Sequence, residues 1–311
     1  MKISESNNAP NIQQTSSERV KSNKTNKINH AETTNTASKT ASQGAAQNAA
    51  RIQSLFAKVG IRANVPLPDA TARRKEIDRR RDILALQRIK NLQAVMEVAL
   101  SVSLPQSSTE NVDPDWFFAF TQLAENIHSP AMQSLWGQIF AVEISHPGSF
   151  SLLSLETLKV LTQRDAKLFS RAVALSSRRL GDTVPRILVG VHQRPSFWSM
   201  LSHRQPEQLN LATFGLSYPD ILALTDMKLI FGSEIESGEL SQEQSVKWRC
   251  GSQNYTLTPT RPGLALVYYK FTSVGAELAK LINRQAADAG PYLQALTQRL
   301  SSSFIIEHEP N

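Results

Sequence analysis

The sequence predicts an α+β protein that is mainly α, with a helical bundle followed by a small winged-helix-like α/β domain. Two helix-start signatures, Asp113-Pro114 and Ser129-Pro130, open segments whose apolar residues follow helical periodicity. After Gly181 the chain changes to short β-branched and apolar segments separated by turn residues, which is typical of strands. These two observations define the class.

Shifts in composition predict the domain boundaries. Residues 1–50 are mostly Ser, Thr, Asn, Gln, Ala and Lys, and such a segment buries too little apolar surface to offset the entropy of ordering. We therefore expect a disordered polar tail at 1–50, a short helix and linker at 51–69, a helical bundle at 70–182 and a winged-helix-like domain at 183–311.

A long helix is expected from about Ala70 to Val102. Its second half has apolar residues at alternating four- and three-residue spacing, which predicts a core-facing stripe of Ala85, Ile89, Leu92, Met96 and Ala99. Its first half is basic. Between residues 73 and 90, eight Lys and Arg residues stand against three acids, a local excess of five positive charges.

Three interpretations of this basic helix remain open. Interspersed acids favour i,i+3 and i,i+4 ion pairs on a solvated face. An arginine face could instead bind nucleic-acid phosphates or an anionic membrane surface. The phosphate-binding candidates on the helix are Arg73, Arg74, Arg79, Arg80 and Arg81.

The two Pro-started helices form a tryptophan-bearing hairpin at the centre of the predicted bundle. Trp116 and Phe120 lie on the apolar stripe of the first helix, and Trp136 and Ile139 lie on that of the second. Glu143 continues the second stripe, where a carboxylate must be paired or hydrogen-bonded to be tolerated. It is either a structural cap or ion pair, or a ligand or proton-transfer group.

A possible interaction surface comprises Gln133, Trp136 and Glu143. Two Glu-x-x-His pairs, Glu125/His128 and Glu143/His146, also resemble half of a di-iron site in a helical bundle. Both pairs end successive antiparallel helices, which would hold them ~20 Å apart. We therefore predict no metal ligand, no cofactor and no catalytic residue.

The remaining elements follow from caps and β-branched segments. Ser151 starts a helix, and Thr162-Gln-Arg-Asp165 is a capping box that starts another, with Arg178 and Arg179 near its end. Strands are expected at 186–191, 228–231, 247–250, 255–257, 264–271 and 304–307, with helices starting at Pro219, Thr272 and Pro291.

The order helix, strand, hairpin, then FTSVGAELAKLI is similar to a winged-helix module. A reading helix in such a module needs cations or amides that contact bases, but the helix from Pro219 to Met227 carries Asp220 and Asp226. The expected wing supplies Lys247 and Arg249 as further phosphate-binding candidates.

Composition limits the class of protein. The formal charge is +7, which allows an anionic partner, and the lone Cys250 excludes an internal disulfide framework and fits a reducing cytosol. No secretory leader and no apolar stretch of ~18–20 residues is visible. We expect a cytoplasmic protein without integral membrane association.

The pattern DPDW…Q..LWG.I.A.E…PGSFS, followed by LETLKVLTQRDAKLF, resembles an uncharacterised family of gammaproteobacterial proteins with a domain of unknown function. The resemblance extends from roughly Arg79 to the C-terminus. It implies no activity, so no catalytic residue follows from it.

The leading hypothesis is a binding or scaffold protein that acts by protein–protein recognition, with an unknown protein partner or by self-association. The alternative is a nucleic-acid-binding protein, regulatory or phage-defence-like, that uses the Arg-rich helix and the wing. A metal-dependent carboxylate enzyme would need the two Glu-x-x-His pairs to converge. The sequence has no Walker A loop, no G-x-G-x-x-G and no G-x-S-x-G motif, so catalysis has no positive support.

Overall fold

The computed structural model describes residues 32–102, 110–194, 208–282 and 289–309, with side chains between residues 44 and 308. It divides the chain into two compact units, Met1–Arg81 and Asp82–Asn311. Helix α2 (Ala70–Ser101) carries the chain from one unit into the other. Each unit is described by itself.

The first unit contains helix α1 (Glu32–Lys58) and the first half of α2. The expected polar tail is therefore wrong from Glu32 onward, because this part of the segment is helical. The reason is its alanine content, since Ala has the highest helix propensity and residues 45–50 include four alanines. Residues 1–31 lie outside the described part of the chain.

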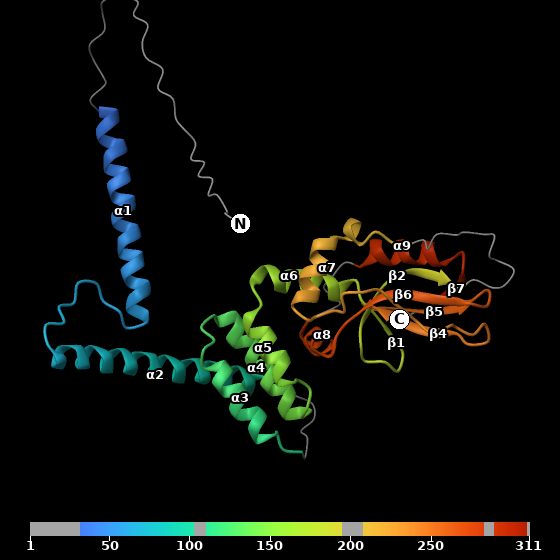
Figure 1. The fold of residues 1–311 in the computed structure, drawn as a ribbon, viewed down its shortest axis with the longest axis horizontal. Helices are drawn as coiled ribbons and strands as arrows, with labels where there is room; N and C mark the ends of the chain where they lie inside the picture. The colour runs from blue at the N-terminus through green and yellow to red at the C-terminus, as the bar shows by residue number, and fades with distance from the viewer. Residues whose placement is uncertain (1–31, 103–109, 195–207, 283–288, 310–311) are drawn as a thin grey trace, which may run out of the picture. The chain divides into compact units, whose positions relative to one another are not determined.

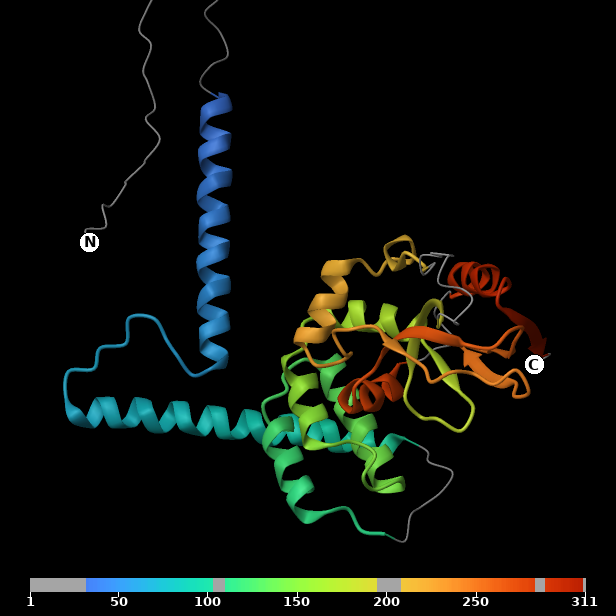
Figure 2. The ribbon, with the colours of Figure 1, turned by 45° about the vertical axis from the view of Figure 1, so that its right-hand side comes forward.

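The second unit begins with the rest of α2 and continues with a group of helices. Their bounds are α3 (Pro114–Ala124), α4 (Pro130–Ser145), α5 (Leu152–Val160) and α6 (Gln163–Ala174). The predicted starts are confirmed: Asp113 accepts the backbone N–H of Asp115, and Thr162 and Asp165 form a reciprocal capping box. Figures 1 and 2 show these helices in green at one end of the unit.

The other end of the unit is a seven-stranded antiparallel sheet in the order β3-β6-β2-β1-β4-β5-β7. The strands are β1 (Ser177–Arg179), β2 (Arg186–Gln193), β3 (Ile235–Glu236), β4 (Val246–Cys250), β5 (Gln253–Pro259), β6 (Leu264–Lys270) and β7 (Phe304–Glu309). The mixed α/β class is thus confirmed. In Figure 2 the strands β4, β5 and β6 are orange, β7 is red, and β1 and β2 are yellow-green.

Helices α7 (Tyr218–Asp226), α8 (Ser273–Leu278) and α9 (Gly290–Leu300) accompany the sheet. Helix α9 packs on the sheet through buried Tyr292, whose hydroxyl donates to the carbonyl of Leu188 on β2 at 2.7 Å. Helix α8 approaches the turn after α7 closely at Gly275, where a Cβ would lie 1.9 Å from the carbonyl oxygen of Leu229. Only glycine fits that approach.

Two predictions about this end are wrong. Residues 228–231 form no strand, because Lys228 adopts a positive φ of 57° that ends α7 and leaves one isolated bridge, Ile230 to Phe271. Helix α6 ends at Ala174, so Arg178 and Arg179 belong to strand β1 and not to a helix end. Short strands such as β1 and β3 carry too little periodicity to be seen in the sequence.

One hydrophobic core runs through the second unit. The same cluster contains Val95 on α2, Trp136 on α4, Phe169 on α6, Leu266 on β6 and Phe304 on β7. The change from helical to mixed structure near residue 182 therefore occurs without a break in the core. No helix in the described part of the chain is long and apolar enough to cross a membrane.

Candidate recognition surfaces

Glu143 holds the loop that follows α4. Its side chain is buried, and its two carboxylate oxygens accept the backbone N–H groups of Gly148 at 2.5 Å and of Phe150 at 3.1 Å. Both donors lie in the loop between α4 and α5, and a charged acceptor makes the stronger kind of hydrogen bond. The prediction that this carboxylate faces the core is confirmed, and its partners are backbone groups.

The same loop connects the hairpin to the far end of the chain. Trp116 Nε1 donates to the carbonyl of Phe150 at 2.7 Å. On the other side, the carboxylate of Glu277 on α8 accepts the backbone N–H of Ser151 at 2.6 Å and the hydroxyl of Ser154 at 2.6 Å. Glu277 thus caps α5 from outside, and its negative charge suits the positive end of that helix.

The structure does not place Gln133, Trp136 and Glu143 on a surface. Trp136 is fully buried, and its indole N–H has no hydrogen-bond partner among the described residues, so this side chain acts by packing. Gln133 is half-buried and donates to the carbonyl of Ile127 and to the side chain of Asn91. All three residues hold the bundle together.

The Glu-x-x-His pairs are occupied by structural contacts too. The Glu125 carboxylate lies 3.6 Å from the guanidinium of Arg88. The backbone carbonyl of Glu125 accepts a hydrogen bond from the side-chain amide of buried Asn91. His128 Nδ1 lies 3.3 Å from the Asn91 amide. Within the ranges the structure describes, no three His, Cys, Asp or Glu side chains lie close enough to share a metal ion.

The Arg-rich half of α2 is partly paired. Arg79 binds Glu76 at 2.6 Å and the carbonyl of Gly60, and Arg62 binds the same carboxylate at 2.8 Å. The hydrogen bonds from Arg79 and Arg62 lower the pKa of Glu76 to about 2. We call these four residues the clasp, because they hold the end of α1 beside α2.

The other predicted phosphate-binding residues of α2 differ from Arg79. Arg73, Arg74 and Arg80 are exposed, and Arg81 forms only an exposed pair with Asp78 at 3.5 Å. An exposed pair of this kind contributes little to stability. Ion pairing therefore accounts for Arg79 and, at the surface, for Arg81, whereas the structure shows only that Arg73, Arg74 and Arg80 are exposed.

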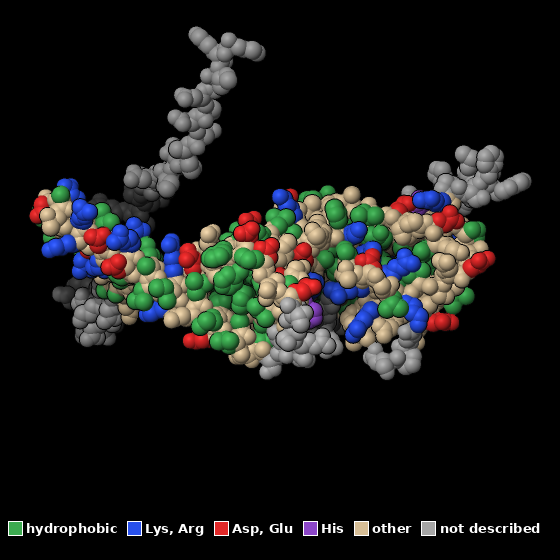
Figure 3. All heavy atoms as spheres, turned by 90° about the horizontal axis from the view of Figure 1, so that it is seen from below, with side chains coloured by type: hydrophobic (Ala, Val, Ile, Leu, Met, Phe, Trp, Pro, Cys, Tyr) green, Lys and Arg blue, Asp and Glu red, His purple; other side chains and the backbone are tan. Residues whose placement is uncertain are grey.

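A second cationic group lies on the sheet. Arg178 on β1 is directly opposite Arg249 on β4, and Lys247 stands two residues before Arg249 on the same face. Burial, and then the charge of Arg249, lower the pKa of the Arg178 guanidinium. Figure 3 shows several Lys and Arg side chains over the end of the unit that holds the sheet. Sequence reasoning missed Arg178 because β1 was not predicted.

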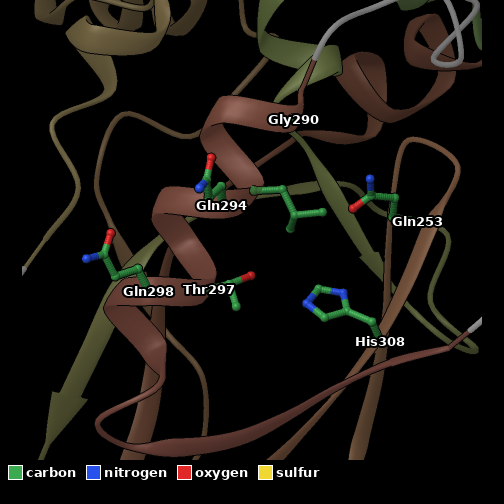
Figure 4. Close-up of a pocket in the computed structure, with 7 residues that line it drawn as sticks. Gln253, Gly290, Gln294, Thr297, Gln298 and His308 are labelled. Carbon is green, nitrogen blue, oxygen red and sulfur yellow. The ribbon is translucent and has the colours of Figure 1, made fainter.

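An open depression lies between α9 and the ends of β5 and β7. It has a volume of about 620 Å³ and is lined by Gln253, Gly290, Leu293, Gln294, Thr297, Gln298 and His308. Figure 4 shows the amides of Gln294 and Gln298 on the helix and the imidazole of His308 on the strand. These are hydrogen-bonding side chains beside Leu293, with no acid among the lining residues.

Helix α2 has two apolar faces. The buried face includes Val95 and Val98, and Gly137 lets α4 approach it so closely that a Cβ there would lie 2.5 Å from Val98. The opposite face carries four large apolar side chains that we call the outer stripe: Leu86, Ile89, Met96 and Leu100, which are 53%, 54%, 52% and 78% exposed.

The prediction for the core stripe of α2 was wrong on this point. Ala85, Ile89 and Met96 are exposed, and only Leu92 and Ala99 are partly buried. The buried face was overlooked because it contains Asn91 and Gln87, two polar residues that bond to each other, while Asn91 also reaches the turn between α3 and α4. A helix with apolar residues on two sides is expected to be covered on both.

Comparison with known proteins gives one match. No curated protein matches the chain, and no solved structure matches it. A family described as "Protein of unknown function (DUF2806)" matches residues 75–297, which cover nearly all of the basic segment of α2, helices α3 to α8 and every strand except β7. The chain belongs to this family of proteins of unknown function.

Proposed function

We propose that the protein is a binding or scaffold protein that recognises another polypeptide through the outer stripe of α2. The supporting observation is that four large apolar side chains line one face of a helix whose opposite face is already buried. Monomeric proteins seldom expose such groups together without a partner. A helix presented in this way is recognised by another helix or by a groove, through side chains at three- and four-residue spacing.

Site-specific photocrosslinking tests this function. A benzoylphenylalanine at Met96 should form a covalent product with a second polypeptide under ultraviolet light in cells that express the protein. The same group at Glu156, an exposed position on α5, is the matched control and should give none. Equal products at both positions, or none at Met96, would contradict a role of the outer stripe in recognition.

Nucleic-acid binding is the second candidate function, and the Arg178–Arg249 pair favours it. Like charges directly opposite each other on neighbouring strands destabilise a sheet, and an anion between them would remove the repulsion. In a winged-helix-like use of this region, the β4–β5 hairpin would be the wing that meets phosphates. Asp220 lies on α7, the helix that would read bases, and it accepts hydrogen bonds from Ser217 in a capping box. The role of this carboxylate is therefore structural.

Fluorescence anisotropy with a labelled single-stranded RNA tests this second candidate. Binding should weaken as the salt concentration rises. Replacing Arg178 and Arg249 by Gln should remove about two phosphate contacts, and each lost contact should reduce the slope of log binding constant against log salt concentration by roughly 0.7. The exposed Lys159→Gln is the control, and it should change the slope by at most one contact. Identical slopes in wild type and in the double variant would exclude the pair as a phosphate site.

A further inference from the structure

The outer stripe has the spacing of a coiled-coil seam. Leu86, Ile89, Gln93, Met96 and Leu100 follow one another at three, four, three and four residues, which is the heptad pattern. The seam extends over 15 residues of α2, or ~21 Å of helix. Its single polar member, Gln93, is exposed and lies at the centre. A seam of this kind fits a partner helix better than a flat surface.

We propose that the partner is a second copy of this chain, and that the two α2 helices pair in antiparallel orientation along their outer stripes. This inference rests on the proposed recognition function and names the partner. In this arrangement the seam residues at each end of one helix meet those at the opposite end of the other. Gln93 lies near the two-fold axis, where a polar seam residue specifies register at some loss of stability.

The distribution of charge on α2 favours the antiparallel orientation. The local excess of five positive charges lies between residues 73 and 90, and six of its eight Lys and Arg residues precede Leu86, where the seam begins. Two parallel helices would place these segments side by side, and like charges would repel. Antiparallel helices that overlap only around Gln93 point the two basic segments away from each other.

Two exposed charges beside the seam complement each other only across an antiparallel pair. Lys90 and Glu97 are both exposed and lie seven residues apart, so they occupy the same position of the heptad. In antiparallel helices Lys90 of one copy lies near Glu97 of the other, and the two-fold axis repeats this pair. In parallel helices Lys90 of one copy lies level with Lys90 of the other, and Glu97 lies level with Glu97, so the opposite charges do not meet.

The alternative occupant of the seam is helix α1 of the same chain. Its last turns expose the apolar side chains of Ile52 and Phe56, and Val59 follows directly after its end. However, residues 44–60 contain Arg51 and Lys58 and no acid, so this helix would bring further positive charge to the basic half of α2. A second copy of α2 supplies Glu97 instead, and we therefore assign the seam to it.

The expected dimer is weak and reversible. Four large apolar side chains per copy form a contact below the ~1,200 Å² that stable interfaces bury, and such contacts are typical of transient complexes. We expect a dissociation constant in the range of about 1–100 μM. The apparent molecular mass of the full-length protein in solution should therefore rise from that of a monomer toward that of a dimer over this range of concentration.

Sedimentation velocity on the full-length chain tests the proposal. The double substitution I89E/M96E should give a monomer at every concentration, with an unchanged melting temperature because both side chains are exposed. V160E, at an apolar residue of α5 that is 74% exposed, is the matched control and should dimerise like the wild type. Equal dimerisation by I89E/M96E and wild type would overturn the assignment of the seam.

A charge swap tests the orientation. E97K should weaken the dimer about tenfold, because Lys90 of one copy then meets a lysine on the other, and K90E/E97K should restore wild-type affinity. A double variant as weak as E97K would overturn the antiparallel pairing.

Wild-type protein that stays monomeric at 100 μM would overturn the second copy as partner. Photocrosslinking at Met96 separates that failure from failure of the proposed function. A crosslinked product with a different protein would support recognition by the outer stripe and exclude the second copy as partner. A product within one chain, to α1, would overturn both the recognition function and the pairing of two copies.

Discussion

Glu143 is a charged residue in an apolar row, and its contacts explain why the row tolerates it. Both carboxylate oxygens accept backbone N–H groups of the loop that contains Pro147, Gly148 and Phe150. The sequence predicted the direction of this side chain, since helical periodicity fixes it. The sequence could not predict the partners, because backbone donors of a loop carry no pattern that a residue type reveals.

Replacing Glu143 by Gln should destabilise the second unit. The amide offers one acceptor oxygen and places an NH₂ donor against the other backbone N–H, so one hydrogen bond to a charged group is lost. We expect the free energy of unfolding to fall by about 2–3 kcal/mol. Urea-induced unfolding followed by tryptophan fluorescence measures this change. The exposed Glu156→Gln should change it by less than about 0.5 kcal/mol, and an equal effect of both substitutions would contradict the role of Glu143.

Among the elements, α2 shows where sequence reasoning succeeds and where it does not. Its bounds were predicted within one residue at the C-terminus, because a charged, alanine- and leucine-rich segment without Gly or Pro favours a helix over its whole length. Its buried face was not predicted. The alternating spacing singled out Ile89 and Met96 but assigned them to the core, whereas both are exposed. The face that packs on α4 depends on Gly137 and on Asn91, whose burial follows from tertiary contacts alone.

The clasp between the end of α1 and α2 should respond to acid. Because Arg79 and Arg62 lower the pKa of Glu76 from 4.5 to about 2, the clasp is fully formed above pH 4.5 and is lost as the pH falls through 2. A titration of the Glu76 carboxyl by ¹³C NMR should therefore have its midpoint near pH 2. A Glu76 midpoint near 4.5 would mean that the clasp does not form in solution.

At the scale of the whole molecule, the second unit behaves as one body because its core is continuous. The sequence predicted the change from helices to strands near residue 182, and composition alone suggested a domain boundary there. Composition could not show that the ring of Phe169 on α6 lies 6.0 Å from that of Phe271 beyond β6, measured between centroids, or that Glu277 caps α5. Such contacts join segments that lie about a hundred residues apart.

Replacing Glu277 by Ala tests this unity. It leaves the backbone N–H of Ser151 and the hydroxyl of Ser154 without their charged acceptor, and should lower the free energy of unfolding by about 2 kcal/mol. Hydrogen exchange followed by mass spectrometry should show faster exchange in both the helices and the sheet, since one cooperative unit unfolds as a whole. Glu243→Ala, at an exposed turn, is the control. Faster exchange confined to α5 would contradict a single unit.

The cap that Glu277 places on α5 also has a consequence for synthesis on the ribosome. Helices α3 to α6 leave the exit tunnel well before α8 has been translated. The backbone N–H of Ser151 therefore has no access to its acceptor, Glu277, until α8 has also been synthesised. Contacts of such long sequence separation slow the acquisition of structure. During that interval the apolar side chains destined for the common core are open to solvent, and the nascent chain is then most prone to aggregate.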